Sequence, residues 1–216
     1  MTFEERLWEA VTADRAVADL REYYDGTTAS GAPLFTGSRF EHLGGGGDRP
    51  GAADTVTADD LIAVQTLSVQ VHPEVALDLL EGDLGRRLAR LLGEIPTGLD
   101  LAAADAAHVD TSSPAEEAWA LLEQRKHIGW VTAGKLLARK RPRLLPVYDQ
   151  VVRCAVGRPG GFWLALRDAL RADDLALHHA LTALRRRAEL PETVSALRVL
   201  DVVLWTGHRH DHSDRH

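Results

Sequence analysis

RKHIGWVTAGKLLARKRPRLLPVYDQVV, residues Arg125 to Val152, is the stretch around which the rest of the chain is organised. A short turn containing Gly129 joins two helical patterns, and two prolines then force an extended link before a helix restarts at about Asp149. Between Arg125 and Arg158, nine Lys or Arg stand against one carboxylate, a formal charge of +8, whereas the whole chain carries −7. This asymmetry predicts a surface for a polyanion, and nucleic acid is the commonest candidate.

The composition is that of a folded protein of a reducing cytoplasm. The chain has 216 residues, 45% of them hydrophobic and 26% charged, which suffices for one sizeable core. The one cysteine, Cys154, excludes an intrachain disulfide and a cysteine-held cluster, so we expect no metal and no cofactor. No apolar run approaches the roughly 20 residues that span a bilayer, and residues 1–20 are amphipathic and charged. We therefore expect neither membrane insertion nor export.

The spacing of apolar residues predicts a mainly α fold. Helical patterns cover residues 3–24, 58–71, 73–82, 83–95, 100–108, 114–125, 130–140, a segment from about 149, 162–170, 173–188 and 191–205. Thr57 and Asp60 form a capping-box-like start for one of these helices, and Ser113 with Pro114 starts another. The pattern at 191–205 is apolar almost all round, which predicts a buried helix.

Residues 27–57 break the helical pattern. Their glycines and prolines, including the run Gly44 to Gly47, predict an ordered loop with room for a small β-hairpin, followed by a flexible Gly-rich tip. A loop of this length in a compact domain points to a substrate lid. At the other end, residues 207–216 hold four histidines and are expected to be a disordered tail.

The chain reads as a single compact helical domain over residues 1–216. The pattern also allows two lobes, with residues 58–156 as one region and residues 1–57 and 157–206 packed against it. The oligomeric state is left open.

The turn at Gly129 has the physical features of a phosphate-binding device. Backbone N–H groups at a tight turn and at the start of the following helix point outward, and the helix dipole favours an anion there. Nearby Lys and Arg add the attraction that dominates affinity for nucleic acid. A plain αα-hairpin with a solvated basic face explains the same pattern, so both interpretations stand.

The same residues resemble a known family. Ile128-Gly129, Thr132-Ala133, Pro146-Val147, Asp149 and Val152 match, in order, the helix-hairpin-helix segment of DNA base-excision glycosylases related to endonuclease III and adenine DNA glycosylase. Upstream, Leu67-Ser68-Val69-Gln70-Val71 is similar to the helix end that faces DNA in that family. The likeness covers residues from about 58 to 156. The whole chain is also similar to a bacterial family without an established activity.

This resemblance implies a glycosylase-like helical bundle that binds DNA, most readily double-stranded, and has Asp149 as its catalytic carboxylate. A carboxylate beside the developing positive charge of the sugar is the expected way to break an N-glycosidic bond. Capping of the helix that follows would also explain Asp149. The implied DNA contacts are Lys126, His127, Gly129, Thr132, Lys135, Arg139 and Gln70, and the pocket candidates are Trp130, Tyr148 and Tyr24.

Three departures from the family pattern limit the kind of glycosylase that the resemblance implies. His127 stands where the family has the first glycine of the hairpin, and Val131 stands where bifunctional members have a Schiff-base lysine. The cluster cysteines of the endonuclease III branch are missing. The enzyme that remains is a monofunctional, metal-free hydrolase acting in DNA repair. The alternatives are a non-catalytic nucleic-acid-binding module on the same fold, or an enzyme for a small nucleoside-like metabolite, which the acidity and the long loop would suit.

Overall fold

The computed structural model describes residues 1–213, and these residues are mainly helical. The α-helices are α1 (Phe3–Thr12), α2 (Ala16–Asp25), α3 (Ala58–Gln65), α4 (Pro73–Leu80), α5 (Asp83–Glu94), α6 (Pro114–Glu123), α7 (Trp130–Lys140), α8 (Gln150–Ala155), α9 (Phe162–Arg187) and α10 (Ala196–Ser213). Three 3-10 turns are η1 (Thr36–Arg39), η2 (Leu43–Gly45) and η3 (Ala106–His108). The predicted all-α class is confirmed.

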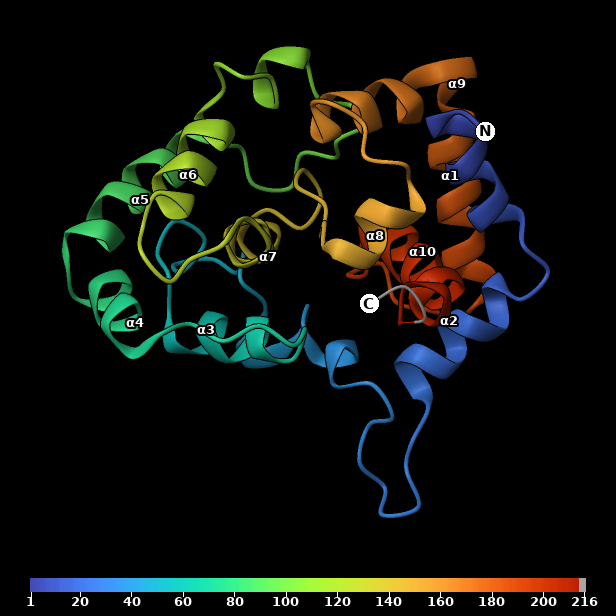
Figure 1. The fold of residues 1–216 in the computed structure, drawn as a ribbon, viewed down its shortest axis with the longest axis horizontal. Helices are drawn as coiled ribbons and strands as arrows, with labels where there is room; N and C mark the ends of the chain where they lie inside the picture. Colours follow the sequence, from blue (N-terminus) through green and yellow to red (C-terminus); the bar gives the residue numbers. More distant parts are fainter. Residues whose placement is uncertain (214–216) are drawn as a thin grey trace.

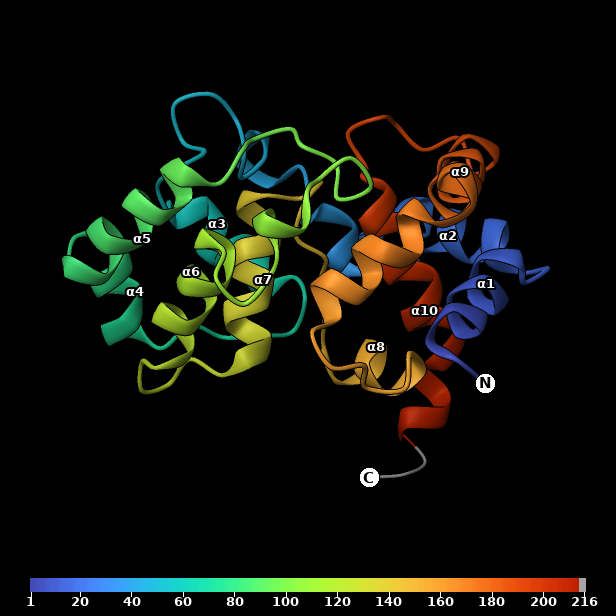
Figure 2. The ribbon, with the colours of Figure 1, turned by 90° about the horizontal axis from the view of Figure 1, so that it is seen from above.

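The helices form two groups that meet beside α7 (Figure 1). We call α3 to α7 the central lobe, and α1, α2, α8, α9 and α10 the terminal lobe. In the central lobe α7 packs on α3 and α6, and in the terminal lobe α10 packs on α1, α2, α8 and α9. The view from above separates the same two groups (Figure 2). The link from Pro142 to Asp149 carries the chain from one lobe to the other.

Caps in the sequence decide where several helices begin. The Thr57 hydroxyl accepts from the Asp60 amide, and the Asp60 carboxylate accepts from the Thr57 amide, so the predicted capping box is confirmed. The Ser113 hydroxyl caps α6 by accepting from the Glu116 amide. The helix predicted over 58–71 ends earlier, at Gln65, because Ser68 has a φ of 61° and leaves the helical region.

The loop from residue 26 to 57 has almost no strand. It contains an isolated bridge between Thr27 and Pro33, followed by η1 and η2. The expected flexible Gly-rich tip is wrong: Gly46 and Gly47 are buried, and a Cβ on Gly47 would collide with the backbone carbonyl of Arg139. The loop is packed against the end of α7 because that helix end presents cations to its carbonyl groups.

Three other helix predictions change in detail. Residues 100–108 form turns and the short η3 in place of a helix. The two helices expected over 162–188 are joined into α9, which is broken by non-helical backbone from Ala172 to Leu175. Helix α10 continues to Ser213, where the sequence predicts disorder from Gly207, while residues 214–216 lie outside the described residues. Within residues 1–213, no helix combines the length and the apolarity that a bilayer crossing requires.

Candidate functional site

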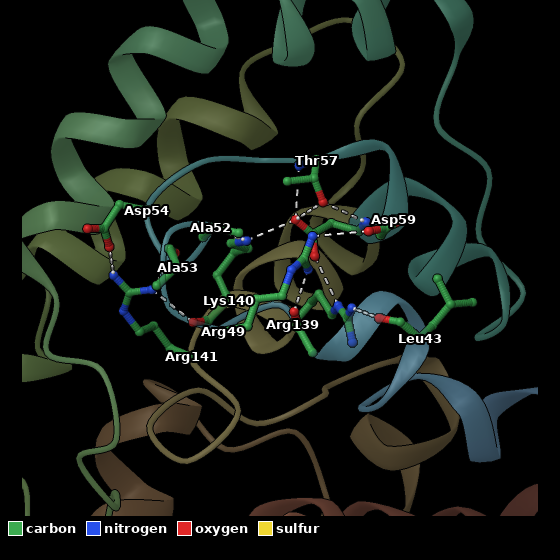
Figure 3. Close-up of polar contacts among 12 residues, drawn as sticks. Leu43, Arg49, Ala52, Ala53, Asp54, Thr57, Asp59, Arg139, Lys140 and Arg141 are labelled. Carbon is green, nitrogen blue, oxygen red and sulfur yellow. Dashed lines mark hydrogen bonds and ion pairs between the residues drawn. The ribbon is translucent and has the colours of Figure 1, made fainter.

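Much of the basic stretch lies inside the protein. Arg139 is 1% exposed and Lys140 is fully buried, and both pair with Asp60 of α3, itself fully buried. Arg139 Nε lies 3.0 Å from Asp60 Oδ1, and Lys140 Nζ lies 2.8 Å from Asp60 Oδ2. Figure 3 shows these contacts around the labelled Arg139 and Lys140. We call Asp60, Arg139 and Lys140 the Asp60 cluster.

Backbone carbonyls of the long loop complete the Asp60 cluster. Arg139 donates to the carbonyls of Phe40, Glu41 and Leu43, and Lys140 Nζ donates to the Ala52 carbonyl at 2.8 Å. Burying a cation is favourable only when its donors are satisfied, and here the carbonyls of residues 40–52 satisfy them. The glycine-rich loop therefore serves as an internal cation cradle.

Arg141 is buried in the same manner. Its Nε donates to the Ile95 carbonyl at 2.8 Å. Its Nη1 donates to the Ala53 carbonyl at 2.8 Å, and its Nη2 pairs with Asp54 at 2.6 Å; Figure 3 labels these two partners. Four members of the basic stretch, counting Lys135 described below, are thus internal. This corrects the expectation of a continuous basic surface, and it leaves neither Lys135 nor Arg139 accessible to a DNA phosphate.

The hairpin before α7 does remain at the surface. Lys126, His127 and Gly129 are exposed, whereas Thr132 is 9% exposed and faces inward. His127 has a φ of 71°, the left-handed conformation for which glycine is usually required, so the turn is formed despite the substitution. Arg125 pairs with Asp78 of α4, which neutralises one of the two hairpin cations.

A second surface segment lies beside the hairpin. The ring of His72 stacks on the ring of His127, with centroids 4.3 Å apart and an interplanar angle of 15°. Gln70, two residues before His72, is exposed on the same segment. The two segments that the sequence assigns to DNA contact therefore meet at one edge of the molecule.

A cavity of about 450 Å³ lies between the two lobes, and we call it the Asp149 cleft. Its walls include Thr66 to Val69, Val131 and Lys135 from the central lobe, Asp149 to Val151 from the link and α8, and Leu34 to Gly37 from the long loop. The loop that the sequence suggests as a substrate lid therefore supplies one wall of this cavity. Phe35 stacks on Tyr23 with centroids 5.2 Å apart, and the Thr36 hydroxyl donates to the Thr66 carbonyl at 2.8 Å.

Asp149 uses its two carboxylate oxygens differently. Its Oδ1 accepts from the amides of Val151 and Val152 at 3.0 and 3.1 Å, so the residue caps α8 as expected. Its Oδ2 faces Lys135 Nζ at 3.5 Å. Lys135 also donates to the Leu67 carbonyl at 2.8 Å, and burial lowers the pKa of this lysine while the carboxylate of Asp149 opposes that shift.

Helix α10 adds a second charged pair to the cleft. Arg198 pairs with Asp201 one turn further on and with Glu41 of the long loop, and it donates to the Tyr23 hydroxyl at 2.7 Å. The pKa of the Asp201 carboxyl is raised to about 7, because burial, and to a smaller extent the charge of Asp149, outweigh the lowering by Arg198 and Lys135.

Charge balance accounts for this behaviour of Asp201. Two cations, Lys135 and Arg198, face three carboxylates, those of Glu41, Asp149 and Asp201. Holding one proton makes the group neutral in a region of low dielectric constant, which favours the protonated acid. The cleft therefore contains a carboxyl group that can exchange a proton near neutral pH.

None of the three predicted pocket residues lines the Asp149 cleft. Trp130 and Tyr148 line a different cavity on another face of α7, and Tyr24 lines neither cavity. The Tyr24 hydroxyl is buried beside Tyr23 and has no hydrogen-bond partner among residues 1–213, and burial raises its pKa well above the ordinary value.

Sequence reasoning missed the charged residues of α10 and the partner of the buried cations. Arg198 and Asp201 stand three residues apart in a helix that the sequence marks as apolar almost all round. An ion pair at this spacing inside such a helix is the signal that could have identified them, because buried charges need partners. Asp60 was assigned to a helix cap alone, and nothing local in the sequence connects it with Arg139.

Residues 16–208 match the model of a family described as "Family of unknown function (DUF6308)". The match spans most of the chain, so the protein belongs to this family. No curated protein and no solved structure matches the chain. Membership of this family assigns no activity to the chain.

Proposed function

We propose that the Asp149 cleft binds a nucleoside unit and hydrolyses its N-glycosidic bond, with Asp149 as the catalytic carboxylate. The observation that carries the proposal is the position of Asp149: two amides fix one carboxylate oxygen, Lys135 lies 3.5 Å from the other, and the residue lines a cavity of about 450 Å³. The resemblance to helix-hairpin-helix glycosylases implies the same residue for the same chemistry.

The chemistry follows from charge. As the bond breaks, its electron pair leaves with the base and positive charge develops on the sugar, which a fixed carboxylate stabilises. Water then adds to the sugar carbon and loses a proton, while the departing base gains one. Asp149 is held in place by its capping contacts, so it need not reorganise during this step.

The walls of the cleft suit a planar base. Val69, Val131 and Val202 supply apolar surface, and Trp205 and Phe35 supply aromatic surface. In an enzyme acting on DNA, the base would have to leave the stack to reach Asp149. The segment Thr66 to Val69 lines the cleft and continues to Gln70 and His72 beside the hairpin, so a duplex at that edge would lie next to the cleft mouth.

One observation favours a small nucleoside as the substrate instead of DNA. Lys135, Arg139, Lys140 and Arg141 are buried and Arg125 is paired, so the edge around the hairpin has little free positive charge for phosphates. A small substrate needs no such surface. Both versions require the same bond to break at Asp149.

The test is base release measured by mass spectrometry from three substrate sets: duplexes carrying damaged or mismatched bases, single strands carrying the same bases, and free nucleosides. We expect release from one set, and a loss of about 10²- to 10³-fold in rate for Asp149→Asn. Release by wild type and variant at equal rates would refute the catalytic role. Duplex binding without release from any set would favour the non-catalytic binding module.

A further inference from the structure

A second cavity, of about 500 Å³, lies on another face of α7. Trp130 and Gly134 of α7 face this cavity, whereas Val131 and Lys135 face the Asp149 cleft. In the link, Tyr148 likewise lines this cavity while its neighbour Asp149 lines the cleft. The two sites share a wall but no catalytic residue, so the second cavity needs an explanation of its own. We call it the aromatic cavity.

Aromatic side chains dominate its walls. They come from α6, α7, the link and the start of α9: Trp119, Trp130, Tyr148, Phe162 and Trp163. Tyr148 stacks on Phe162 with centroids 3.9 Å apart, and Trp130 lies 5.6 Å from Tyr148 at a tilted angle. Several rings around a cavity of this size favour a planar ligand that can stack between them.

Three charged side chains that line the cavity, those of Glu116, Arg153 and Arg158, have no oppositely charged partner within residues 1–213. Among the described residues, the Glu116 side chain has no hydrogen bond or ion pair, although it is partly buried. Burial raises the pKa of the Glu116 carboxyl. Arg153 lies over the Trp130 ring, 5.3 Å from its centroid, and in the described chain neither Arg153 nor Arg158 pairs with a carboxylate.

The helix wall of the cavity is left open by a glycine. Gly134 lies within α7, is buried, and has no atom within 4 Å of where a Cβ would stand. Glycine inside a helix costs about 0.5–1 kcal/mol relative to alanine. Since packing does not demand a glycine at this position, the space that it leaves is consistent with a ligand.

From these features we infer that the aromatic cavity binds a guanine mononucleotide. The rings would hold the base, Glu116 would accept from it, and Arg153 and Arg158 would bind the phosphate. Of the three carboxylates that line the cavity, Asp110 accepts from Ser112 and Glu123 is exposed, which leaves Glu116 to meet the base. Guanine fits a single carboxylate because its N1–H and its amino group donate side by side. Adenine presents one donor beside an acceptor at the same edge, so one carboxylate oxygen would face a lone pair. Arginine is the usual partner of a phosphate.

This inference does not rest on the proposed function. Binding can be followed by intrinsic fluorescence, because three of the five tryptophans line the aromatic cavity. We expect saturable quenching by GMP, with binding of AMP and of guanosine each weaker by about tenfold or more. Glu116→Gln should weaken GMP by about tenfold and leave AMP unchanged.

A matched pair of glycine substitutions tests whether GMP binds in the aromatic cavity. Gly134→Leu should fill the aromatic cavity and abolish GMP quenching, whereas Gly93→Leu, an equally unobstructed helical glycine exposed on α5, should bind as wild type does. Circular dichroism checks that both variants fold. The inference is overturned if GMP gives no saturable signal at millimolar concentration, if AMP binds as tightly as GMP, or if folded Gly134→Leu binds GMP like wild type.

Discussion

The Asp60 cluster and the Asp149 cleft are both buried groups of charges, and they differ in whether the protein itself satisfies them. In the Asp60 cluster the two cations outnumber the one carboxylate, and loop carbonyls accept the remaining donors. In the Asp149 cleft carboxylates outnumber cations, and the group borders a cavity of about 450 Å³. Satisfied charges hold lobe and loop together, whereas unsatisfied charges beside a cavity are available to a substrate.

The largest expected effect is on the satisfied cluster. Asp60→Asn leaves Arg139 and Lys140 buried without an anion, so we expect the free energy of unfolding in urea to fall by about 3–5 kcal/mol. Asp59→Asn is the matched control, because Asp59 pairs with Arg49 near the surface and should contribute about 1 kcal/mol or less. Equal losses for the two variants would show that the Asp60 cluster is no more important than a surface pair.

The second-largest expected effect is a pH dependence of stability that arises from Asp201 in the Asp149 cleft. The pKa of Asp201 is raised from 3.8 to about 7, so the folded state holds this proton more tightly than the unfolded chain. The Asp201 carboxyl therefore stabilises the folded state at low pH, and this stabilisation is lost as the pH rises from about 4 through 7. Asp201→Asn removes this dependence.

The measurement is the difference in unfolding free energy between Asp201→Asn and wild type across this pH range. Below pH 4 the two proteins should be similar, and above pH 7 the variant should be more stable by about 2–4 kcal/mol. A difference that does not change with pH would mean that Asp201 is ionised like an ordinary carboxyl group.

The smallest expected effect on stability is that of a charge outside both the Asp60 cluster and the Asp149 cleft. Lys126 is exposed on the hairpin, so Lys126→Ala should change stability by less than about 0.5 kcal/mol. If the DNA version of the proposed function holds, the same variant lowers the salt dependence of duplex binding by about one phosphate contact. An unchanged salt slope would favour the small-nucleoside version.

Local patterns in the sequence predicted much of the fold. The caps at Thr57 and Ser113, and the helix starts that they define, depend on neighbouring residues and are confirmed. The packed loop was not predicted, because the need for glycine at position 47 comes from the Arg139 backbone and side chain, which are distant in sequence. Glycine-rich segments look flexible unless the partner that they contact is known.

The candidate site was predicted only in part. Asp149 follows from its motif, and its place on a cavity is a finding of the structure. Lys135 and Arg139 were assigned to a surface because charge counting contains no information about burial, which Asp60 and Asp149 make possible here. Asp201 and Arg198 reach the site through the packing of α10 against α8, which no local pattern contains.

The catalytic role of Asp149 is tested most directly by measuring both the rate of base release and the free energy of unfolding of Asp149→Asn. In Asp149→Asn the amide oxygen can still accept from Val151 and Val152, but the buried Lys135 loses its ion-pair partner, so the free energy of unfolding should fall by about 1–3 kcal/mol while the protein stays folded. Base release per folded molecule, on the substrate set that wild type processes, should fall by about 10²-fold or more. An unchanged rate, or a loss of rate explained by a matching loss of stability, would contradict the account.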